Sequence, residues 1–387
     1  MSAAARPKLI YLVTEDWYFW SHRLPMARAA RAAGYDVAVA TRVFEHGERI
    51  RGEGFALHPL QWRRRSVGPM ATLRAIAEIA ALYRRERPDI VHHVALKPAV
   101  LGGIAALLAG VPFVVNAVTG VGFVASSPSL RARVLRLPVN FVLARLLERG
   151  NSRVVVQNDD DRRLLLALNP HAGNRIAVIR GSGVDLTRFH PVPEPPAPPV
   201  VAAYVGRLLA DKGVPVLIEA QQRLQRRGID VRLMLVGAPD PENPSSVTPA
   251  QLAQWRTLPG VTLLGHQSEI PAVWASAHIA VLPSRREGLQ KSLLEAAAMA
   301  RPIVATDVPG CREIARGGVN ALLVPPDDPA ALAAALEQLA HDTELRHRFG
   351  AASRRLVETD LGDAAVGAAT VALYRELSRP RDATARP

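Results

Sequence analysis

Cysteine is almost absent from this chain of 387 residues, which contains only Cys311. A single thiol excludes an intramolecular disulfide and any metal site built from several cysteines, and it fits a reducing compartment. The N-terminus also lacks the pattern of a secretory signal peptide, because its apolar run is short and turns acidic at Glu15 and Asp16. Both absences favour a protein that stays in the cytoplasm.

Charged residues are missing from Pro98 to Leu130, a run long enough for a membrane-spanning helix. Several glycines and a proline interrupt the run, however, with a turn signal at Gly110-Val-Pro112. We therefore prefer a buried helix followed by a buried strand. The Gly-rich apolar loop at 118–124 then follows a strand, at the end where open α/β sheets hold ligands.

Acidic residues do not balance the basic ones, and the net charge is +13. Residues 1–190 hold 27 Lys/Arg and 14 Asp/Glu, whereas residues 191–387 hold 21 of each, so the whole excess lies in the first half. This asymmetry indicates an anionic partner: a phospholipid surface, a diphosphate substrate or nucleic acid. The alternative is an Arg-rich composition without functional meaning.

Strand-like and helix-like patterns alternate along both halves, which is typical of parallel α/β sheets. Six prolines in nine residues at 191–199 predict a linker with polyproline character. We expect an N-terminal domain at 1–190, a C-terminal domain at 200–360, a helix at 361–378 and a flexible tail at 379–387.

The apolar runs predict the individual strands, and Asp16–His22 is expected to be an aromatic loop. The first domain should contain strands at 8–14, 36–41, 89–93, 112–116, 153–157 and 176–179. The second should contain strands near 200–206, 231–236, 261–264, 278–282, 303–306 and 321–324.

Two basic segments of the first half each allow two interpretations. Residues 130–149 form an apolar helical pattern with five arginines and a proline that would kink it. This helix suits either a membrane interface or a core with solvated arginines. Trp62-Arg63-Arg64-Arg65 is either a lipid-phosphate clamp or a solvated charge run.

Two stretches of the second half contain the candidate chemistry. Arg207 and Lys212 lie in a connection between a strand and a helix, where two cations would neutralise a diphosphate, although such a motif also occurs in ordinary surface loops. Glu287 and Glu295 stand eight residues apart, and Gly288 between them predicts the first on a loop and the second on a helix. The N-terminus of that helix is an anion site, so the stretch suits a nucleotide sugar.

These motifs resemble the retaining family-4 glycosyltransferases of the GT-B fold. The resemblance rests on GRLLADKG, SRREGLQKSLLEA, RPIVATDVPGCREI and GVNALLVPPDD. The first half resembles the members that extend undecaprenyl-diphosphate-linked saccharides, through HRLPMARAARAAGYDVAVAT, HHVALKPAVLGGIAALLAGVPFVVNAVTGVGFV, VQNDDD and RGSGVDLTRFHP. It implies an α/β fold of two Rossmann-like doubly wound domains that face each other across a cleft, with the last helix packing back on the first domain.

The resemblance also implies roles for individual residues in a retaining, metal-independent hexosyltransferase without a cofactor. Arg207 and Lys212 would bind the diphosphate, Glu295 the ribose, and Glu287 would approach the donor sugar. No Asp-x-Asp motif is placed to hold a metal, and we read 159–161 as a helix N-terminus. The other expected substrate contacts are Gly206, Gly288, Leu289, Gln290 and Lys291 for the donor, and His93, Lys97, Thr119 and Gly120 for the acceptor.

The acceptor side departs from the family pattern. Many family members have a Gly-Gly loop after the first strand, where this chain has residues 15–20. Many also have a His-Gly pair where this chain has Thr119-Gly120. Gln290 replaces a common proline near the donor sugar. His93 and Lys97 have structural alternatives of their own, as a packed histidine and a surface lysine.

We expect transfer of an N-acetylhexosamine or hexose from a nucleotide sugar, expected to be UDP-linked, to a polyprenyl-diphosphate-linked saccharide in surface polysaccharide or glycan assembly. The enzyme would attach peripherally to the anionic inner face of the cell membrane. The alternatives are a GT-B nucleotide-sugar epimerase and a non-catalytic, nucleotide-sugar-binding partner of a membrane transferase. Nucleic acid is disfavoured, because the Gly-rich loop does not resemble a base-stacking platform.

Overall fold

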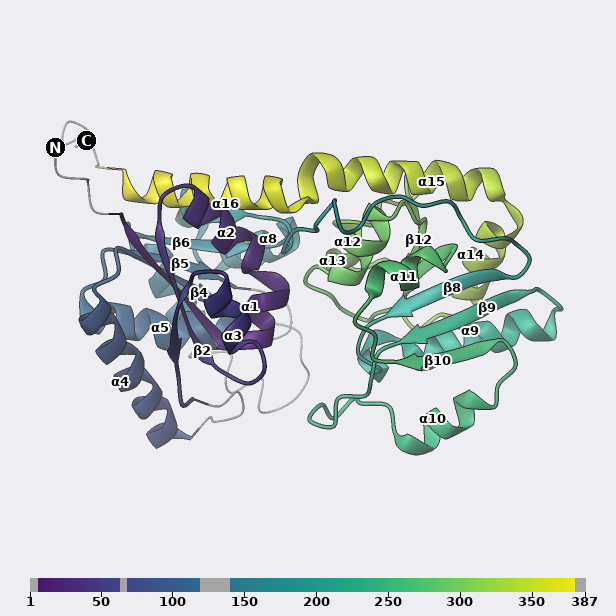
Figure 1. Ribbon diagram of the computed structural model, residues 1–387, viewed down its shortest axis with the longest axis horizontal. Coiled ribbons are helices and arrows are strands. Elements are labelled where there is room, and N and C mark those ends of the chain that lie inside the picture. Colours follow the sequence, from purple (N-terminus) through teal and green to yellow (C-terminus); the bar gives the residue numbers. More distant parts are fainter. Residues whose placement is uncertain (1–5, 63–67, 119–139, 380–387) are drawn as a thin grey trace. The chain divides into compact units, whose positions relative to one another are not determined.

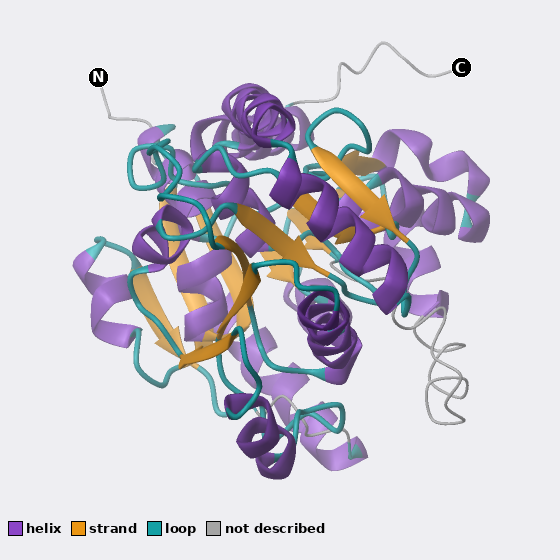
Figure 2. Cartoon of the chain, turned by 90° about the vertical axis from the view of Figure 1, so that its right-hand side faces the viewer, coloured by secondary structure: helices purple, strands orange, loops and turns teal. Residues whose placement is uncertain are grey.

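A computed structural model describes residues 6–62, 68–118 and 140–379 of the chain. Its contacts divide the chain into two compact units: unit 1 contains the chain up to Ser182 and from Ala364 onward, and unit 2 contains Gly183–Asp363. Each unit is a parallel sheet covered by helices (Figures 1 and 2). The predicted α/β class with two doubly wound, Rossmann-like domains is therefore confirmed.

The sheet of unit 1 has seven strands among the described residues, in the order β3-β2-β1-β4-β5-β6-β7. The strand order reverses between β1 and β4, which makes their carboxyl ends a topological switch point, the usual place for ligands in such sheets. The strands are β1 (Lys8–Glu15), β2 (Asp36–Arg42), β3 (Ala56–Pro59), β4 (Ile90–Val94), β5 (Phe113–Ala117), β6 (Ser152–Val156) and β7 (Ile176–Val178).

Helices cover both faces of this sheet, because successive strand residues point to opposite faces and both sets are apolar. Leu9 and Tyr11 pack with residues of α2 and α16, whereas Ile10 and Leu12 pack with residues of α4 and α5. The helical elements are α1 (Asp16–His22), α2 (Leu24–Ala32), α3 (Gly47–Gly52), α4 (Pro69–Glu86), α5 (Leu96–Ala109), α8 (Asp159–Leu168), the 3-10 helix η1 (Pro170–Arg175) and α16 (Asp363–Ser378).

Helix α16 returns the end of the chain to unit 1 (Figure 1). The Tyr374 hydroxyl lies 2.8 Å from the Tyr11 hydroxyl and 2.5 Å from His92 Nδ1, and all three side chains are buried. Hydrogen bonds among buried polar groups are costly to break, so this cluster fixes α16 on the sheet.

The sheet of unit 2 has the order β10-β9-β8-β11-β12-β13 in the described part of the chain. Its strands are β8 (Val200–Val205), β9 (Val231–Val236), β10 (Val261–Gly265), β11 (Ile279–Leu282), β12 (Ile303–Thr306) and β13 (Ala321–Val324). Its helical elements are the 3-10 turn η2 (Ala210–Lys212), α9 (Val214–Arg226), α10 (Pro249–Arg256), α11 (Ile270–Ala275), α12 (Lys291–Ala298), α13 (Pro309–Arg312), α14 (Pro329–His341), α15 (Thr343–Leu356) and the π-helical turn η3 (Val357–Leu361).

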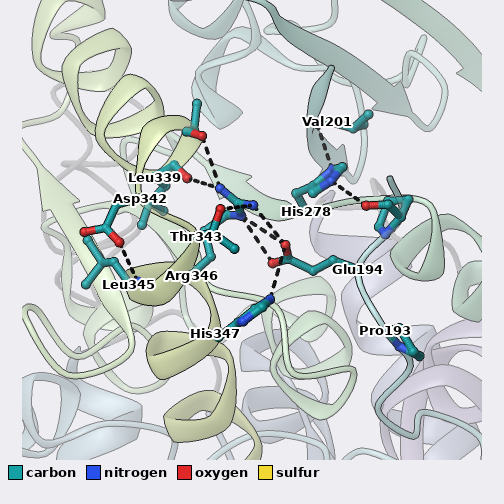
Figure 3. A network of polar contacts seen from close by, with 12 residues as sticks. Pro193, Glu194, Val201, His278, Leu339, Asp342, Thr343, Leu345, Arg346 and His347 are labelled. Atoms are coloured by element: carbon teal, nitrogen blue, oxygen red, sulfur yellow. Dashed lines mark hydrogen bonds and ion pairs between the residues drawn. The ribbon is translucent and has the colours of Figure 1, made fainter. Parts of the chain in front are cut away.

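The Pro-rich segment 191–199, expected to be a linker, is instead a packed part of unit 2 (Figure 3). The guanidinium of Arg346 donates to the Glu194 carboxylate at 3.1 Å, and the carbonyl of Pro195 lies 3.1 Å from His278 Nε2. Proline lacks an N–H group but keeps its carbonyl acceptor. A Pro-rich segment therefore packs through its carbonyls and its one acidic side chain.

The aromatic segment 16–22, expected to be a loop, is helix α1. The buried Asp16 carboxylate accepts the backbone N–H groups of Phe44 and His46 at 2.8 and 2.9 Å, which ties the start of the helix to the loop after β2. Phe19 is buried in the core. The four consecutive aromatic residues at 17–20 hide the helical period.

The basic helix expected at 130–149 lies partly outside the described residues, and 140–148 are helical. Phe141 is exposed there, with the Arg145 guanidinium carbon 5.5 Å from its ring centroid. Of the Gly-rich loop 118–124, only Val118 is described, and it is buried.

Candidate functional site

Two strand ends of unit 2 bring the predicted donor-site residues to one edge of the sheet. β8 and β11 are parallel neighbours, with Ile279 paired with Ala202 and Ala280 with Ala203. The segments 206–213 and 283–290 follow these strands, so both lie at the carboxyl edge.

Glycines allow these segments to approach one another closely. Gly213 has φ +73°, and a Cβ built there would lie 1.9 Å from the Pro283 carbonyl oxygen. A Cβ on Gly310, in α13, would lie 2.4 Å from the carbonyl oxygen of Gly288. A side chain at either position would force the segments apart, so glycine is required for the geometry of the site.

Lys212 and Glu287 form the central ion pair of the site. Lys212 Nζ lies 2.6 and 2.7 Å from the two carboxylate oxygens, and Ser284 Oγ donates to one of them at 2.5 Å. Both side chains are largely buried, with 16% and 5% exposed. Gln290 Oε1 accepts a longer bond from Lys212 at 3.4 Å. A buried pair with this many hydrogen bonds holds both loops in place.

Arg207 reaches the same edge but pairs with a different acid. Its Nη1 lies 2.7 Å from Asp240 Oδ2, in the loop after β9, and half of its side chain is exposed. The Tyr204 hydroxyl donates to the Arg207 carbonyl at 2.7 Å and fixes the backbone. The guanidinium is thus positioned by Asp240 while remaining accessible to solvent.

Glu295 lies on α12, and Glu287 lies on the loop before it, as predicted. Burial raises the pKa of the Glu295 carboxyl to about 7, against the opposing positive charges of Lys291 and Arg188. Lys291 Nζ is 4.0 Å away. Gln290 is the N-cap residue of α12, and its side chain makes no capping bond.

Two of the residues expected on the acceptor side lie in unit 1. His93 is fully buried, with Nε2 3.1 Å from the Tyr83 hydroxyl and Nδ1 2.8 Å from Asn116 Oδ1. Both ring nitrogens have protein partners, so His93 is a core residue and not the substrate contact that the sequence predicted. Lys97 is a half-buried residue in the first turn of α5, with Nζ 5.9 Å from the Trp62 ring centroid.

Thr119 and Gly120 lie outside the described residues. Asp159 begins α8, with Asn158 as its N-cap, so the interpretation of 159–161 as a helix N-terminus is confirmed.

Sequence reasoning missed two polar partners of the site. Ser284 is fully buried and donates to Glu287, and Asp240 orients Arg207. A signal existed for both, since each lies just after a strand of unit 2. The spacing of the motifs does not predict which acidic side chain pairs with which cation.

The site as a whole combines the cations Arg207 and Lys212, three carboxylates and a helix N-terminus at one strand edge. Such a set matches a ligand that presents phosphates at one point and hydroxyl groups at another.

Comparison with known proteins agrees with this chemistry. Residues 199–342 match the family profile "Glycosyl transferases group 1", and residues 8–157 match "Glycosyl transferase 4-like". The chain is 30% identical to alpha-maltose-1-phosphate synthase of Mycolicibacterium smegmatis, over 78% of this chain and 82% of that one. It is 25% identical to N,N'-diacetylbacillosaminyl-diphospho-undecaprenol alpha-1,3-N-acetylgalactosaminyltransferase of Campylobacter jejuni, over 84% and 87%.

A solved structure shares the fold. HepE of Anabaena, in complex with UDP-glucose, superposes with a TM-score of 0.76 at 17% identity, over 95% of this chain and 99% of that one. The chain therefore belongs to the group 1 glycosyltransferases, with a family-4-like first half and the GT-B fold. The family and fold implied by the sequence motifs are confirmed.

The raised pKa of Glu295 predicts a pH-dependent stability. The folded chain binds this proton more tightly than the unfolded chain, so the free energy of unfolding should fall as pH rises from 5 to 8. The loss due to this residue should be roughly 2 to 3 kcal/mol. Urea unfolding of the wild type and of Glu295→Gln, each at pH 5 and at pH 8, isolates the contribution of this carboxyl to the free energy of unfolding. An equal difference between the two proteins at pH 5 and pH 8 would contradict the assignment.

Proposed function

We propose that this glycosyltransferase moves an N-acetylhexosamine or hexose from a UDP-sugar to a polyprenyl-diphosphate-linked saccharide, with retention and without a metal ion. The observation that carries the donor half is the Lys212–Glu287 pair beside α12 and Glu295. The relative from Campylobacter, named for an undecaprenol-diphosphate acceptor, supports the acceptor half. HepE, solved with UDP-glucose, supports the choice of nucleotide.

Binding of the donor exchanges partners at the two cations. In this proposal a diphosphate accepts hydrogen bonds from Lys212 and Arg207, each of which is held beforehand by a carboxylate. The ammonium supplies a compact charge and the guanidinium a planar fork. Preorganised cations of this kind stabilise the negative charge that develops as the diphosphate leaves, which is the main electrostatic demand of the reaction.

The remaining donor contacts follow from the arrangement around α12. Glu295 accepts hydrogen bonds from the ribose hydroxyls, and its pKa of about 7 means that donor binding favours the ionised carboxylate. Backbone N–H groups from Gly288 to Lys291 meet phosphate or sugar oxygens. Glu287 approaches the sugar when Lys212 turns to the diphosphate, and Gln290, 3.4 Å from Lys212, lies where it would contact the sugar.

The acceptor and the membrane surface are proposed for unit 1, which contains the whole basic excess of the chain. Its helices α4 and α5 expose large apolar side chains close to arginines, and Arg84 donates to the Leu108 carbonyl at 3.0 Å. Exposed apolar groups among basic ones suit an anionic lipid interface. No helix in the described residues is long and apolar enough to span a membrane, and we propose peripheral attachment. The exposed apolar residues are Met70, Leu73, Ile104, Leu107 and Leu108.

Replacing the cations tests the enzymatic proposal. Arg207→Met and Lys212→Met should each lower kcat by on the order of 10² to 10³, because each removes one preorganised charge-stabilising donor. The assay is UDP release from a panel of UDP-sugars, with a prenyl-diphosphate sugar as acceptor.

The control is Arg223→Ala, because Arg223 is a half-exposed residue of α9 whose surface pair with Glu219 contributes little to stability. It should change kcat less than twofold. Circular dichroism separates lost folding from lost turnover. UDP binding by the wild type without any turnover of the panel would favour a non-catalytic binding partner, and unchanged kcat in Lys212→Met would refute the assigned role.

Vesicle binding tests the membrane proposal. The chain should sediment with phosphatidylglycerol vesicles at low salt and detach at high salt, since a Debye length shortens from about 10 Å at 0.1 M to about 3 Å at 1 M. Leu107→Glu should weaken binding. The matched control is Leu264→Glu, at an exposed apolar position of unit 2. Absence of binding at low salt, or equal binding by both variants, would contradict the proposed surface.

A further inference from the structure

Unit 1 contains a cavity of about 270 Å³ at the carboxyl edge of its sheet, which we name the Lys97 pocket. It lies where β3 leads into α4 and where β4 leads into α5, since Trp62 follows β3 by three residues and Lys97 follows β4 by three. The pocket is close to the lower size limit of ligand cavities, so it suits a head group rather than a whole substrate. Its lining is Gln61, Trp62, Ala71, Thr72, Arg74, Ala75, Glu78, Lys97 and Leu101.

Hydrogen-bond donors outnumber acceptors in this lining. Lys97 and Arg74 are cations, and burial lowers the pKa of the Lys97 ammonium, as expected where water is partly excluded. Trp62 is 5% exposed, and its buried Nε1–H has no hydrogen-bond partner in the described part of the chain. The one carboxylate of the lining, Glu78, accepts the Gln61 N–H at 2.9 Å. The lining therefore presents two cations and one carboxylate that already accepts a protein hydrogen bond, a balance that suits an anionic group.

The choice of lysine at this position is itself informative. Only four of the 48 basic residues of the chain are lysines, and the other 44 are arginines. Three of these lysines lie beside glutamates: Lys8 by Glu86, Lys212 by Glu287 and Lys291 by Glu295. Lys97 lies against the Trp62 ring. A lysine presents a compact point charge, which suits a phosphate oxygen.

The backbone before Lys97 is strained. Ala95 has φ 78° and ψ 166°, a region that is essentially restricted to glycine. Its N–H donates to the Ala117 carbonyl at 2.9 Å, and its carbonyl accepts the N–H of Ala99 at 3.0 Å. Strain of this kind persists where surrounding contacts over-determine it, and it sets the start of α5, and with it Lys97, at the edge of the sheet.

We propose that the Lys97 pocket binds the diphosphate of the polyprenyl-linked acceptor. Lys97 and Arg74 would pair with the phosphate oxygens, and Trp62 would form part of the wall beside them. The first isoprene unit would contact the apolar part of the lining, formed by Ala71, Ala75 and Leu101. This inference rests on the proposed function and adds to it the residues that recognise the acceptor.

Binding of geranylgeranyl diphosphate, measured by isothermal titration in detergent, tests this proposal. Lys97→Met, which keeps the apolar stem, and Lys97→Gln should each weaken binding roughly tenfold to a hundredfold, the effect of losing one charged hydrogen bond. Both variants should bind UDP as the wild type does. The control is Arg85→Ala, on the exposed face of α4, which should bind both ligands normally.

Other arms of the experiment identify the site and the ligand. Lys212→Met should lose UDP binding but still bind geranylgeranyl diphosphate. Loss of both ligands in this variant would show instead that the lipid occupies the donor site. Phosphatidylglycerol vesicles should bind the wild type and Lys97→Met equally. Weaker vesicle binding by Lys97→Met would show that Lys97 contacts lipid head groups instead. Wild-type affinity for geranylgeranyl diphosphate in either Lys97 variant would overturn the inference. Failure of the wild type to bind UDP would instead count against the proposed function.

Discussion

The contact between Lys212 and Glu287 is the interaction on which the geometry of the candidate donor site depends. It joins the segment after β8 to the segment after β11, with the ammonium 2.6 and 2.7 Å from the two carboxylate oxygens. Removing one partner of such a buried pair leaves an uncompensated charge, which typically costs about 3 to 5 kcal/mol. The pair therefore keeps the site assembled when no donor is bound, and in our proposal a diphosphate takes over the lysine.

The neighbouring groups of the site are also held by protein partners. Asp240 holds the Arg207 guanidinium at 2.7 Å, and Ser284 holds the Glu287 carboxylate at 2.5 Å. Each cation that we assign to the diphosphate has a protein partner beforehand, which keeps it at the strand edge until the donor takes its place. Gly213 makes this possible, because a Cβ there would overlap the Pro283 carbonyl. The glycine, the ion pair and the strand order are thus parts of one constraint.

Much of the fold could be predicted because buried parallel strands are short apolar runs. Residues 231–236 and 303–306 match β9 and β12 without any shift. The short strand β3 was missed because it is partly exposed and ends at a proline, as edge strands often do. The Pro-rich segment was misassigned because proline density argues against regular elements but does not reveal that Glu194 pairs with Arg346.

Site residues were predictable as types, but their pairing was not. The spacing of Glu287 and Glu295 correctly placed one on a loop and one on a helix. His93 shows the limit of sequence reasoning, because every residue of β4 is buried and the sequence does not distinguish a packed histidine from a ligand-facing one. The imidazole ring of His93 forms hydrogen bonds with Tyr83 and Asn116. These residues belong to α4 and β5, which lie elsewhere in the sequence.

A crystal structure of the chain with UDP bound would show whether the two cations bind the diphosphate. We expect hydrogen bonds from Lys212 Nζ and the Arg207 guanidinium to the diphosphate, with the Glu295 carboxylate on the ribose hydroxyls. Lys212 should have left at least one oxygen of Glu287. A nucleotide bound elsewhere, or one bound here while Lys212 keeps both Glu287 oxygens and Glu295 makes no ribose contact, would contradict it.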